Sequence, residues 1–287
     1  MRIVVVTAFM LALTGCETMD LGGLGGELGN IAKLADMAGT AKEAFVPASA
    51  DEEAEIGRES SAVLLGAAPL LNDKKLQAYV NRVGLWVAMQ STRADLPWRF
   101  AVLDDPDINA FAAPGGYVFL TKGLLVRLRN EAELAGVLAH EIAHVQARHH
   151  LVAIRKQARM KLAGQAIGLA IDDSPEKKQL AAIGRGVKTV YGRGLDRKDE
   201  YHADRVGVVL AARAGYDPYG LVAALQTIER VNPDAGEMSL LLKTHPKPAD
   251  RISRLDTLMQ GHFAGIPDGG LGEKRFRDQL RHLASAR

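Results

Sequence analysis

The sequence predicts a mainly helical α+β domain in which a small β-sheet precedes one apolar helix. Three observations indicate this fold. Several long segments carry apolar residues at three- and four-residue spacing, which is the pattern of amphipathic helices. Between Trp98 and Thr121 the pattern changes to short strands around a Pro-Gly-Gly turn. Finally, Leu134 to His150 is expected to form one continuous helix that is largely apolar and therefore buried.

The start of the chain is predicted to be an export signal. Arg2, the apolar run Ile3–Leu13 and a small-residue cleavage site make residues 1–15 typical of a lipoprotein signal peptide. Cys16 is the only cysteine in the chain, and the run Leu-Thr-Gly-Cys resembles a bacterial lipobox, in which this cysteine is acylated. The alternative is an ordinary signal peptide with an incidental cysteine.

Residues 16–50 are expected to tether the protein to a membrane. Acyl chains on Cys16 would anchor it stably, because each buried CH₂ group contributes about 0.8 kcal/mol. The glycine-rich segment Leu21–Asn30 favours a flexible linker. The apolar stripe from Ile31 to Phe45 predicts an amphipathic helix that docks on its own domain. Membrane or partner binding by this helix is the alternative, which its mixed charges disfavour.

Residues 51–287 are predicted to form a single domain. The formal net charge is only +2 and no basic cluster is interleaved with aromatic residues, so nucleic acid is not an expected partner. The expected elements, in order, are the helices Glu52–Ala67 and Asn72–Met89, the strands Trp98–Leu103, Asn109–Ala112 and Tyr117–Thr121, and, beyond the apolar helix, the helices Leu151–Leu169, Glu176–Val190 and Asp196–Ala214, with a loop at Tyr191–Gly194.

The predicted sheet leaves two interpretations open. One edge can offer its backbone to an extended polypeptide, which adds as a further strand. Alternatively, the sheet is structural and its edges are covered.

The motif His140-Glu141-Ile142-Ala143-His144 predicts a metal site with its own base. A helix advances about 100° per residue, so His140 and His144 lie on the same face, one turn apart. Neutral imidazoles are common zinc ligands, and a catalytic zinc uses three protein ligands. Glu141 can take a proton from water at that ion. The motif therefore predicts one Zn²⁺ per chain, and the alternative is a pair of accidental core histidines.

The third ligand is expected on a second helix, because one helix face cannot surround an ion. In the predicted helix Asp196–Ala214, Glu200 and Asp204 share a face, whereas His202 is offset by about 200° from Glu200. Glu200 and His202 therefore cannot both be ligands. Spacing alone favours Glu200 without excluding a histidine or an aspartate.

Further motifs accompany these residues. Asn109–Phe119 precedes the metal helix, Tyr216-Asp217-Pro218 follows the third-ligand helix, and Thr244-His245-Pro246 precedes Arg251 by a few residues. With the two helix motifs, they resemble the metallopeptidase family that contains the CAAX prenyl proteases, HtpX and the mitochondrial Oma1-type proteases. The resemblance covers roughly Glu52–Leu258 and implies a zincin-type metallopeptidase domain, with the sheet next to the metal helix.

The resemblance also implies roles for individual residues. Glu200 is the third zinc ligand, Asp204 orients His140, and Arg251 lies at the active site with His245, which stabilises the substrate oxyanion. A carboxylate that accepts the second N–H of a ligand histidine fixes its tautomer, and a histidine donor stabilises an oxyanion. The alternatives are a surface ion pair for Asp204 and a turn position for His245.

Two departures from the family pattern refine the expectation. Many members carry Glu where this chain has His202, which is expected to face away from zinc. Membrane-spanning members insert helices around the metal helix, and the absence of such insertions here resembles the periplasmic lipoprotein branch. Glu17 after the cysteine favours the outer membrane by the same resemblance. His149 and His150 are expected off the metal face, as surface or capping residues at the C-terminus of the metal helix.

The sequence thus predicts a zinc-dependent endopeptidase of the bacterial cell envelope, periplasmic and lipid-anchored, whose substrates are misfolded or unassembled envelope proteins. The alternative from another class is a periplasmic chaperone or assembly lipoprotein with a latent zincin site. A third possibility is self-inhibition, in which the segment Asn232–Pro248 closes over the metal and His245 binds it.

Overall fold

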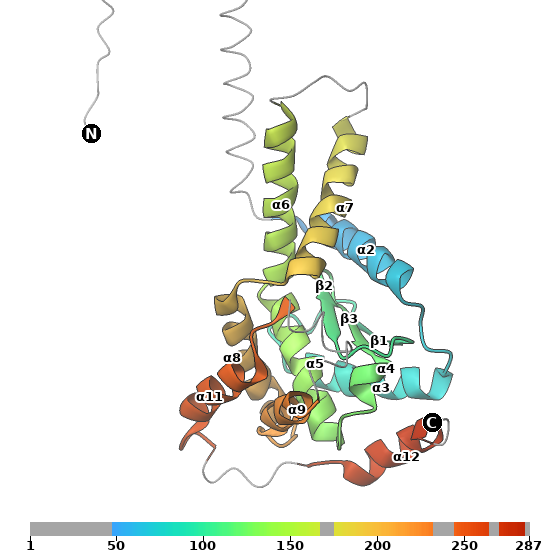
Figure 1. Ribbon diagram of the computed structural model, residues 1–287, viewed down its shortest axis with the longest axis vertical. Helices are drawn as coiled ribbons and strands as arrows, with labels where there is room; N and C mark the ends of the chain where they lie inside the picture. The colour runs from blue at the N-terminus through green and yellow to red at the C-terminus, as the bar shows by residue number, and fades with distance from the viewer. Residues whose placement is uncertain (1–47, 167–174, 232–243, 264–269, 285–287) are drawn as a thin grey trace, which may run out of the picture. The chain divides into compact units, whose positions relative to one another are not determined.

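The computed structural model describes residues 48–166, 175–231, 244–263 and 270–284. These residues form a mainly helical domain with one three-stranded sheet, which confirms the predicted fold class (Figure 1). The elements are α2 (Ala50–Ala67), α3 (Lys74–Ala88), β1 (Arg99–Leu103), β2 (Ala110–Ala113), β3 (Tyr117–Thr121), α4 (Lys122–Leu125), α5 (Glu131–Gln146), α6 (His149–Ala166), α7 (Pro175–Arg193), α8 (Arg197–Arg213), α9 (Gly220–Glu229), α11 (Pro248–Met259) and α12 (Glu273–Ala284).

The sheet has the strand order β1-β3-β2. Strands β2 and β3 form an antiparallel hairpin around the predicted Pro-Gly-Gly turn, while β1 pairs with β3 in parallel. Gly115 and Gly116 turn the hairpin with φ angles of 77° and 97°, values that favour glycine over residues with a Cβ. The Pro-Gly-Gly sequence is therefore the local cause of the hairpin.

The outer edge of β1 is covered by side-chain amides from α3. Gln77 accepts from the backbone N–H of Val102 and donates to its carbonyl oxygen, both at 2.8 Å. Asn81 accepts from the backbone N–H of Phe100 at 3.0 Å. Two side chains of a helix thus occupy the positions that a neighbouring strand would take.

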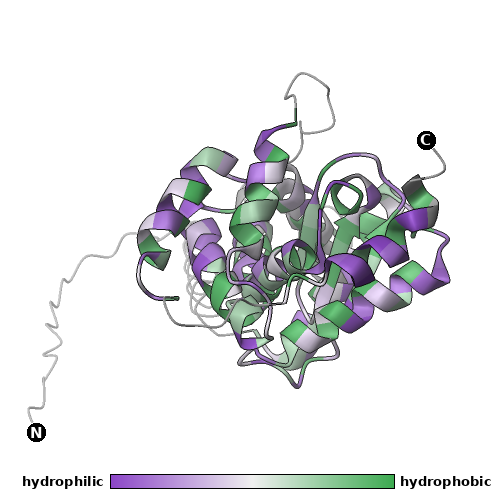
Figure 2. Cartoon of the chain, turned by 90° about the horizontal axis from the view of Figure 1, so that it is seen from below, coloured by the Kyte–Doolittle hydropathy of each residue, from purple (hydrophilic) through white to green (hydrophobic). Residues whose placement is uncertain are grey.

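Helix α5 is buried along almost its whole length, as its apolar sequence predicts. Asn130 caps its start by accepting from the backbone N–H of Glu133 at 2.9 Å. The helix lies between the sheet and the helices α8 and α9 (Figure 1). The outer helices turn hydrophilic residues toward solvent and hydrophobic residues inward (Figure 2). The metal motif therefore lies on the most deeply buried helix of the described residues.

The predicted helix Leu134–His150 is wrong at its end, because α5 stops at Gln146 and α6 begins at His149. Arg148, between the two helices, has a φ of 58°, which breaks the helical path. Its Nε lies 3.1 Å from the buried carboxylate of Glu53 on α2. A buried carboxylate requires positive partners. The corner between α5 and α6 at Arg148 is therefore explained by Glu53, a residue far away in the sequence.

Other boundaries differ from the prediction in the same region and beyond. The expected loop Tyr191–Gly194 is wrong, because α7 continues to Arg193 and ends at Gly194, whose φ is 78°. Helices α4, α9, α11 and α12 were not among the predicted elements. Helices α6 and α7 pack side by side as an antiparallel pair that extends away from the sheet (Figure 1).

Several predictions lie outside the described residues. They concern the signal peptide, Cys16, the glycine-rich linker, the helix expected at Ile31–Phe45 and most of the segment Asn232–Pro248. Within the ranges that the structure does describe, no helix is both long and apolar enough to cross a bilayer.

Candidate metal centre

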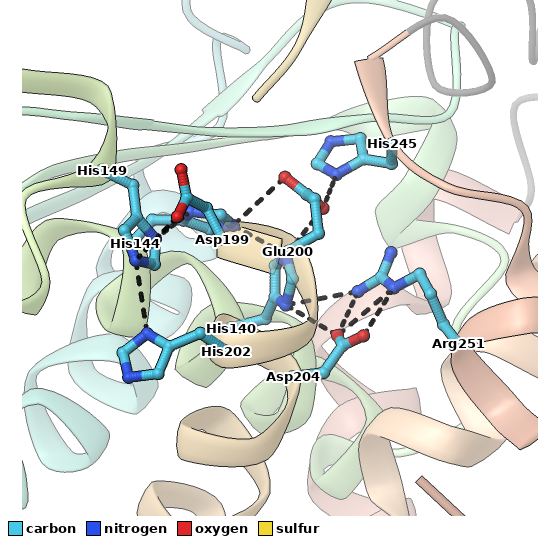
Figure 3. A network of polar contacts seen from close by, with 9 residues as sticks. All are labelled: His140, His144, His149, Asp199, Glu200, His202, Asp204, His245 and Arg251. Atoms are coloured by element: carbon cyan, nitrogen blue, oxygen red, sulfur yellow. Dashed lines mark hydrogen bonds and ion pairs between the residues drawn. The ribbon is translucent and has the colours of Figure 1, made fainter. Parts of the chain in front are cut away.

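Three buried side chains converge on one point between α5 and α8 (Figure 3). Nε2 of His140 lies 3.1 Å from Nε2 of His144. The carboxylate of Glu200 lies 3.7 Å from the first of these nitrogens and 3.5 Å from the second. All three residues are at most 3% exposed. The structure thus brings together the three predicted metal ligands.

The approach of α8 to α5 depends on Gly207. A Cβ at this position would lie 2.9 Å from the backbone nitrogen of His140, closer than ordinary contacts allow. Without a side chain there, the two helices pack backbone to backbone, and Glu200 on α8 reaches the histidines of α5. A small residue two turns away therefore determines where the third ligand lies.

The three side chains fit a divalent metal ion of the zinc type. In a tetrahedral site with metal–ligand distances of about 2.0–2.1 Å, neighbouring ligand atoms are about 3.3 Å apart. The two ring nitrogens are 3.1 Å apart, Nε2 of His140 lies 3.7 Å from Oε2 of Glu200, and Nε2 of His144 lies 3.5 Å from Oε1 of the same carboxylate, so the observed separations bracket that value. Two imidazole nitrogens and one carboxylate oxygen form a donor set common in catalytic zinc sites, where a fourth position stays free for water.

Asp204 and Arg251 support His140 from the side opposite the metal position (Figure 3). Oδ1 of Asp204 lies 2.9 Å from Nδ1 of His140, so the ring donates Nδ1–H and keeps the Nε2 lone pair toward the centre. Arg251 donates to both oxygens of Asp204, at 2.6 and 3.0 Å. Burial would raise the pKa of Asp204, but the charge of Arg251 outweighs it and holds the pKa well below its usual range.

Glu141, the predicted base, is buried in α5 beside His140 and is only 3% exposed. Burial raises the pKa of its carboxyl group, and the negative charge of Glu200 acts in the same direction. A base with a raised pKa binds a proton more readily near neutral pH, which suits a group that must take up and release one.

His245 lies at the centre and contacts a metal ligand. Its Nδ1 is 2.6 Å from Oε2 of Glu200, and its ring centroid is 6.0 Å from that of His140. Burial opposes protonation of His245, but the charge of Glu200 and their hydrogen bond raise its pKa. Burial likewise opposes ionisation of Glu200, yet His245 lowers the pKa of that carboxyl group to about 2. His245 therefore binds the carboxylate of Glu200, one of the three predicted metal ligands, directly.

The expectation for His149 is wrong. Because the helix breaks at Arg148, Nδ1 of His149 lies 3.0 Å from Nδ1 of the metal ligand His144. His202, which was expected to face away from zinc, is not part of the three-residue cluster, and its Nδ1 lies 3.3 Å from Nε2 of His149 (Figure 3). The sequence offered one signal for these contacts, namely the unusual density of histidines around the motif.

His150 is also closer to the centre than predicted. Its ring stacks on that of Tyr191, with centroids 5.2 Å apart, and lies 5.3 Å from the ring of His144. Its buried Nδ1 has no hydrogen-bond partner among the residues that the structure describes. Burial lowers the pKa of His150 to about 3, so the ring is neutral near pH 7.

Comparison with known proteins places these features in context. The model of Peptidase family M48 matches residues 74–259. The beta-barrel assembly-enhancing protease of Escherichia coli (strain K12) is 32% identical over 211 residues, which cover 71% of this chain and 43% of that protein. The mitochondrial metalloendopeptidase OMA1 of Schizosaccharomyces pombe is 32% identical over 180 residues, covering 62% of this chain and 51% of that protein. The chain thus spans about half of these relatives or less.

Proposed function

Because the chain belongs to Peptidase family M48, we propose that it is a zinc-dependent endopeptidase that cleaves misfolded or unassembled proteins of the bacterial cell envelope. The family match confirms the predicted resemblance and the predicted metallopeptidase class. The observation that carries the proposal is the buried cluster of His140, His144 and Glu200, with Glu141 beside it.

Each residue of the centre has a distinct task in peptide hydrolysis. A zinc ion held by the two histidines and Glu200 would polarise the scissile carbonyl group and make a water molecule more acidic. The carboxylate of Glu141 accepts the proton of the attacking water and passes it to the leaving amine. Asp204 keeps Nε2 of His140 free of a proton, because it binds the N–H on the other side of the ring.

His245 is proposed to stabilise the developing oxyanion. The raised pKa favours the protonated ring, which carries N–H groups at both nitrogens. One N–H stays on Glu200, and the other is left to donate to the oxyanion. Under this proposal His245→Ala lowers the turnover of a peptide substrate. Self-inhibition predicts the opposite, because removal of an inhibitory histidine raises turnover.

The location and the substrates follow from the sequence motifs and the relatives. Residues 1–15 are proposed to be a lipoprotein signal peptide, Cys16 the lipidated residue, residues 16–50 the tether and residues 51–287 the metallopeptidase domain. The relative from E. coli bears a name that refers to β-barrel assembly. This name supports polypeptide substrates, and unassembled β-barrel proteins are candidates. The lipobox followed by Glu17 supports a periplasmic, lipid-anchored place at the outer membrane.

The decisive experiment compares wild type with Glu141→Gln. The variant is expected to bind zinc normally while its kcat on an unfolded protein such as casein falls about 10²- to 10⁴-fold. Glu229→Gln, which removes an exposed carboxylate on α9, serves as the matched control and should retain full activity. Equal cleavage by wild type and Glu141→Gln would contradict the mechanism.

A chelator separates the enzyme from the alternative chaperone. If the protein is a peptidase, phenanthroline abolishes cleavage of an envelope client. If it acts as an assembly factor, client binding persists with the chelator and no cleavage occurs without it. Proteomic comparison of envelope extracts from wild type and Glu141→Gln would then identify the physiological substrates.

A further inference from the structure

Among the residues that the structure describes, none gives the second ligand histidine, His144, the kind of carboxylate support that Asp204 gives to His140. Its outward nitrogen, Nδ1, instead faces Nδ1 of His149 at 3.0 Å. The two rings lie nearly edge to face, with centroids 5.0 Å apart and an interplanar angle of 75°. A ring nitrogen of another histidine thus occupies the position where a hydrogen-bond acceptor for the metal ligand is expected.

The inference rests on the proposed metal site. A histidine that binds a metal through Nε2 carries its proton on Nδ1, so Nδ1 of His144 must donate. The facing nitrogen of His149 must then be the acceptor. We propose that His149 is a positioning residue for His144, whose Nδ1–H it accepts, so that the tautomer and ring orientation of this metal ligand are held in place.

The outer nitrogen of His149 completes the arrangement. If Nδ1 of the neutral ring is an acceptor, its proton resides on Nε2. This nitrogen lies 3.3 Å from Nδ1 of His202 and 4.0 Å from Oδ1 of Asp199, both on α8 (Figure 3). His202 is the nearer acceptor and fixes the tautomer of His149. Each ring therefore donates a hydrogen bond to the next: His144 donates to His149, and His149 donates to His202.

The corner between α5 and α6 makes this contact possible. In a continuous helix His149 would be rotated by about 140° from His144 and would point away from it. The left-handed conformation of Arg148 turns the chain so that His149 returns to the metal ligand. Glu53 holds this corner, because it binds Arg148 at 3.1 Å and Arg93 at 2.6 Å while only 2% exposed.

The test measures zinc affinity by competition with a chromophoric chelator, using the full folded chain. His149→Leu removes the acceptor at similar volume and is expected to weaken zinc binding about 10- to 100-fold. His149→Asn is expected to restore most of the affinity, because its amide oxygen can lie where Nδ1 was and accept the same proton. His262→Leu, at an exposed histidine far along the chain, is the matched control and leaves the affinity unchanged.

A second pair of variants, His149→Asn and His149→Gln, keeps the inference testable if His149→Leu fails to fold. Asn and Gln carry the same amide, but the longer Gln side chain moves its oxygen away from the Nδ1 position. Zinc affinity should therefore be higher in His149→Asn than in His149→Gln. Melting temperatures of the metal-free proteins show whether any loss reflects folding instead.

Three outcomes would overturn the inference. Wild-type affinity in His149→Leu would show that His149 does not support the ligand, while leaving the proposed enzyme intact if Glu141→Gln is inactive. A second zinc equivalent that disappears in His149→Leu would make His149 a ligand rather than a support. A wild-type chain that binds no zinc would remove the proposed function together with the inference.

Discussion

Arg251 binds both carboxylate oxygens of Asp204, at 2.6 and 3.0 Å, while the same carboxylate contacts His140. The pair is almost fully buried, so each charge relies on the other for compensation. His140, a proposed metal ligand, is thereby supported by a carboxylate that cannot rotate away without losing its hydrogen bonds to Arg251. This relationship makes Arg251 important even though it lies outside the metal's own set of ligands.

Arg251→Met should consequently destabilise the fold. The substitution leaves the carboxylate of Asp204 buried without its positive partner, which typically costs about 3–5 kcal/mol. Denaturant unfolding of the metal-free protein measures this loss without interference from zinc. The double variant Arg251→Met with Asp204→Leu should recover part of the stability, and a single variant as stable as wild type would contradict the argument.

Metal removal should lower the melting temperature. Zinc that binds only the folded state stabilises it by about 4 kcal/mol when free zinc is 1,000-fold above the dissociation constant. Calorimetry with and without a chelator measures the shift. His144→Leu, which lacks one ligand, should show a much smaller response, whereas Glu141→Gln should respond like wild type. An identical response in all three proteins would argue against the site.

Gly207→Ala should weaken the metal site from a distance. The added methyl group would meet the backbone of His140 at 2.9 Å, so α8 must shift and carry Glu200 with it. Overpacking of this kind costs about 1–3 kcal/mol, and zinc affinity should fall as well. Gly184→Ala is the matched control, because nothing lies within 4 Å of its added methyl group. That change should be neutral or stabilising.

Glu131 at the start of α5 predicts a pH dependence of stability. Burial would raise its pKa, but hydrogen bonds from Arg275, Tyr79 and Tyr216 outweigh burial and lower it. A carboxyl group whose pKa is lower in the folded state stabilises the fold above its unfolded pKa, and this contribution is lost as pH falls through the folded pKa.

Glu131→Gln therefore tests a contact that joins α12 to the metal helix. At pH 7 the variant should be about 1–3 kcal/mol less stable than wild type. The difference should shrink as the pH falls below the usual titration range of a glutamate and through the lowered pKa of Glu131, where the wild-type carboxylate becomes protonated. Urea unfolding of both proteins at pH 7 and in acid measures this difference in stability. A difference that is independent of pH would contradict the assignment.

The metal cluster could be predicted because its cause is local. The spacing of His140 and His144 places them on one helix face in any α-helix, and the motif Glu200–Asp204 repeats this logic on a second helix. The Pro-Gly-Gly turn was equally informative, since Gly115 and Gly116 adopt angles that favour glycine. Where chemistry and conformation are encoded within a few residues, the sequence was sufficient.

The corner at Arg148 could not be predicted for the opposite reason. Neither glycine nor proline marks it, and its cause is Glu53, which lies almost a hundred residues earlier in the chain. Because the end of the metal helix was predicted too late, His149 was expected at the surface instead of beside His144. The roles assigned to Cys16 and the first 50 residues stay predictions.

The amides of Gln77 and Asn81 have a consequence for the way the sheet can grow. They occupy the outward N–H groups of Phe100 and Val102, so a polypeptide cannot add beside β1. On the β2 side, the carbonyl oxygen of Ala112 already accepts from the hydroxyl of Tyr191 at 2.6 Å, and the N–H of Ala110 is bound to Oδ1 of Asn109. Side chains thus take up backbone groups at both edges of this short sheet, which is one way in which natural sheets avoid pairing with the strands of other chains.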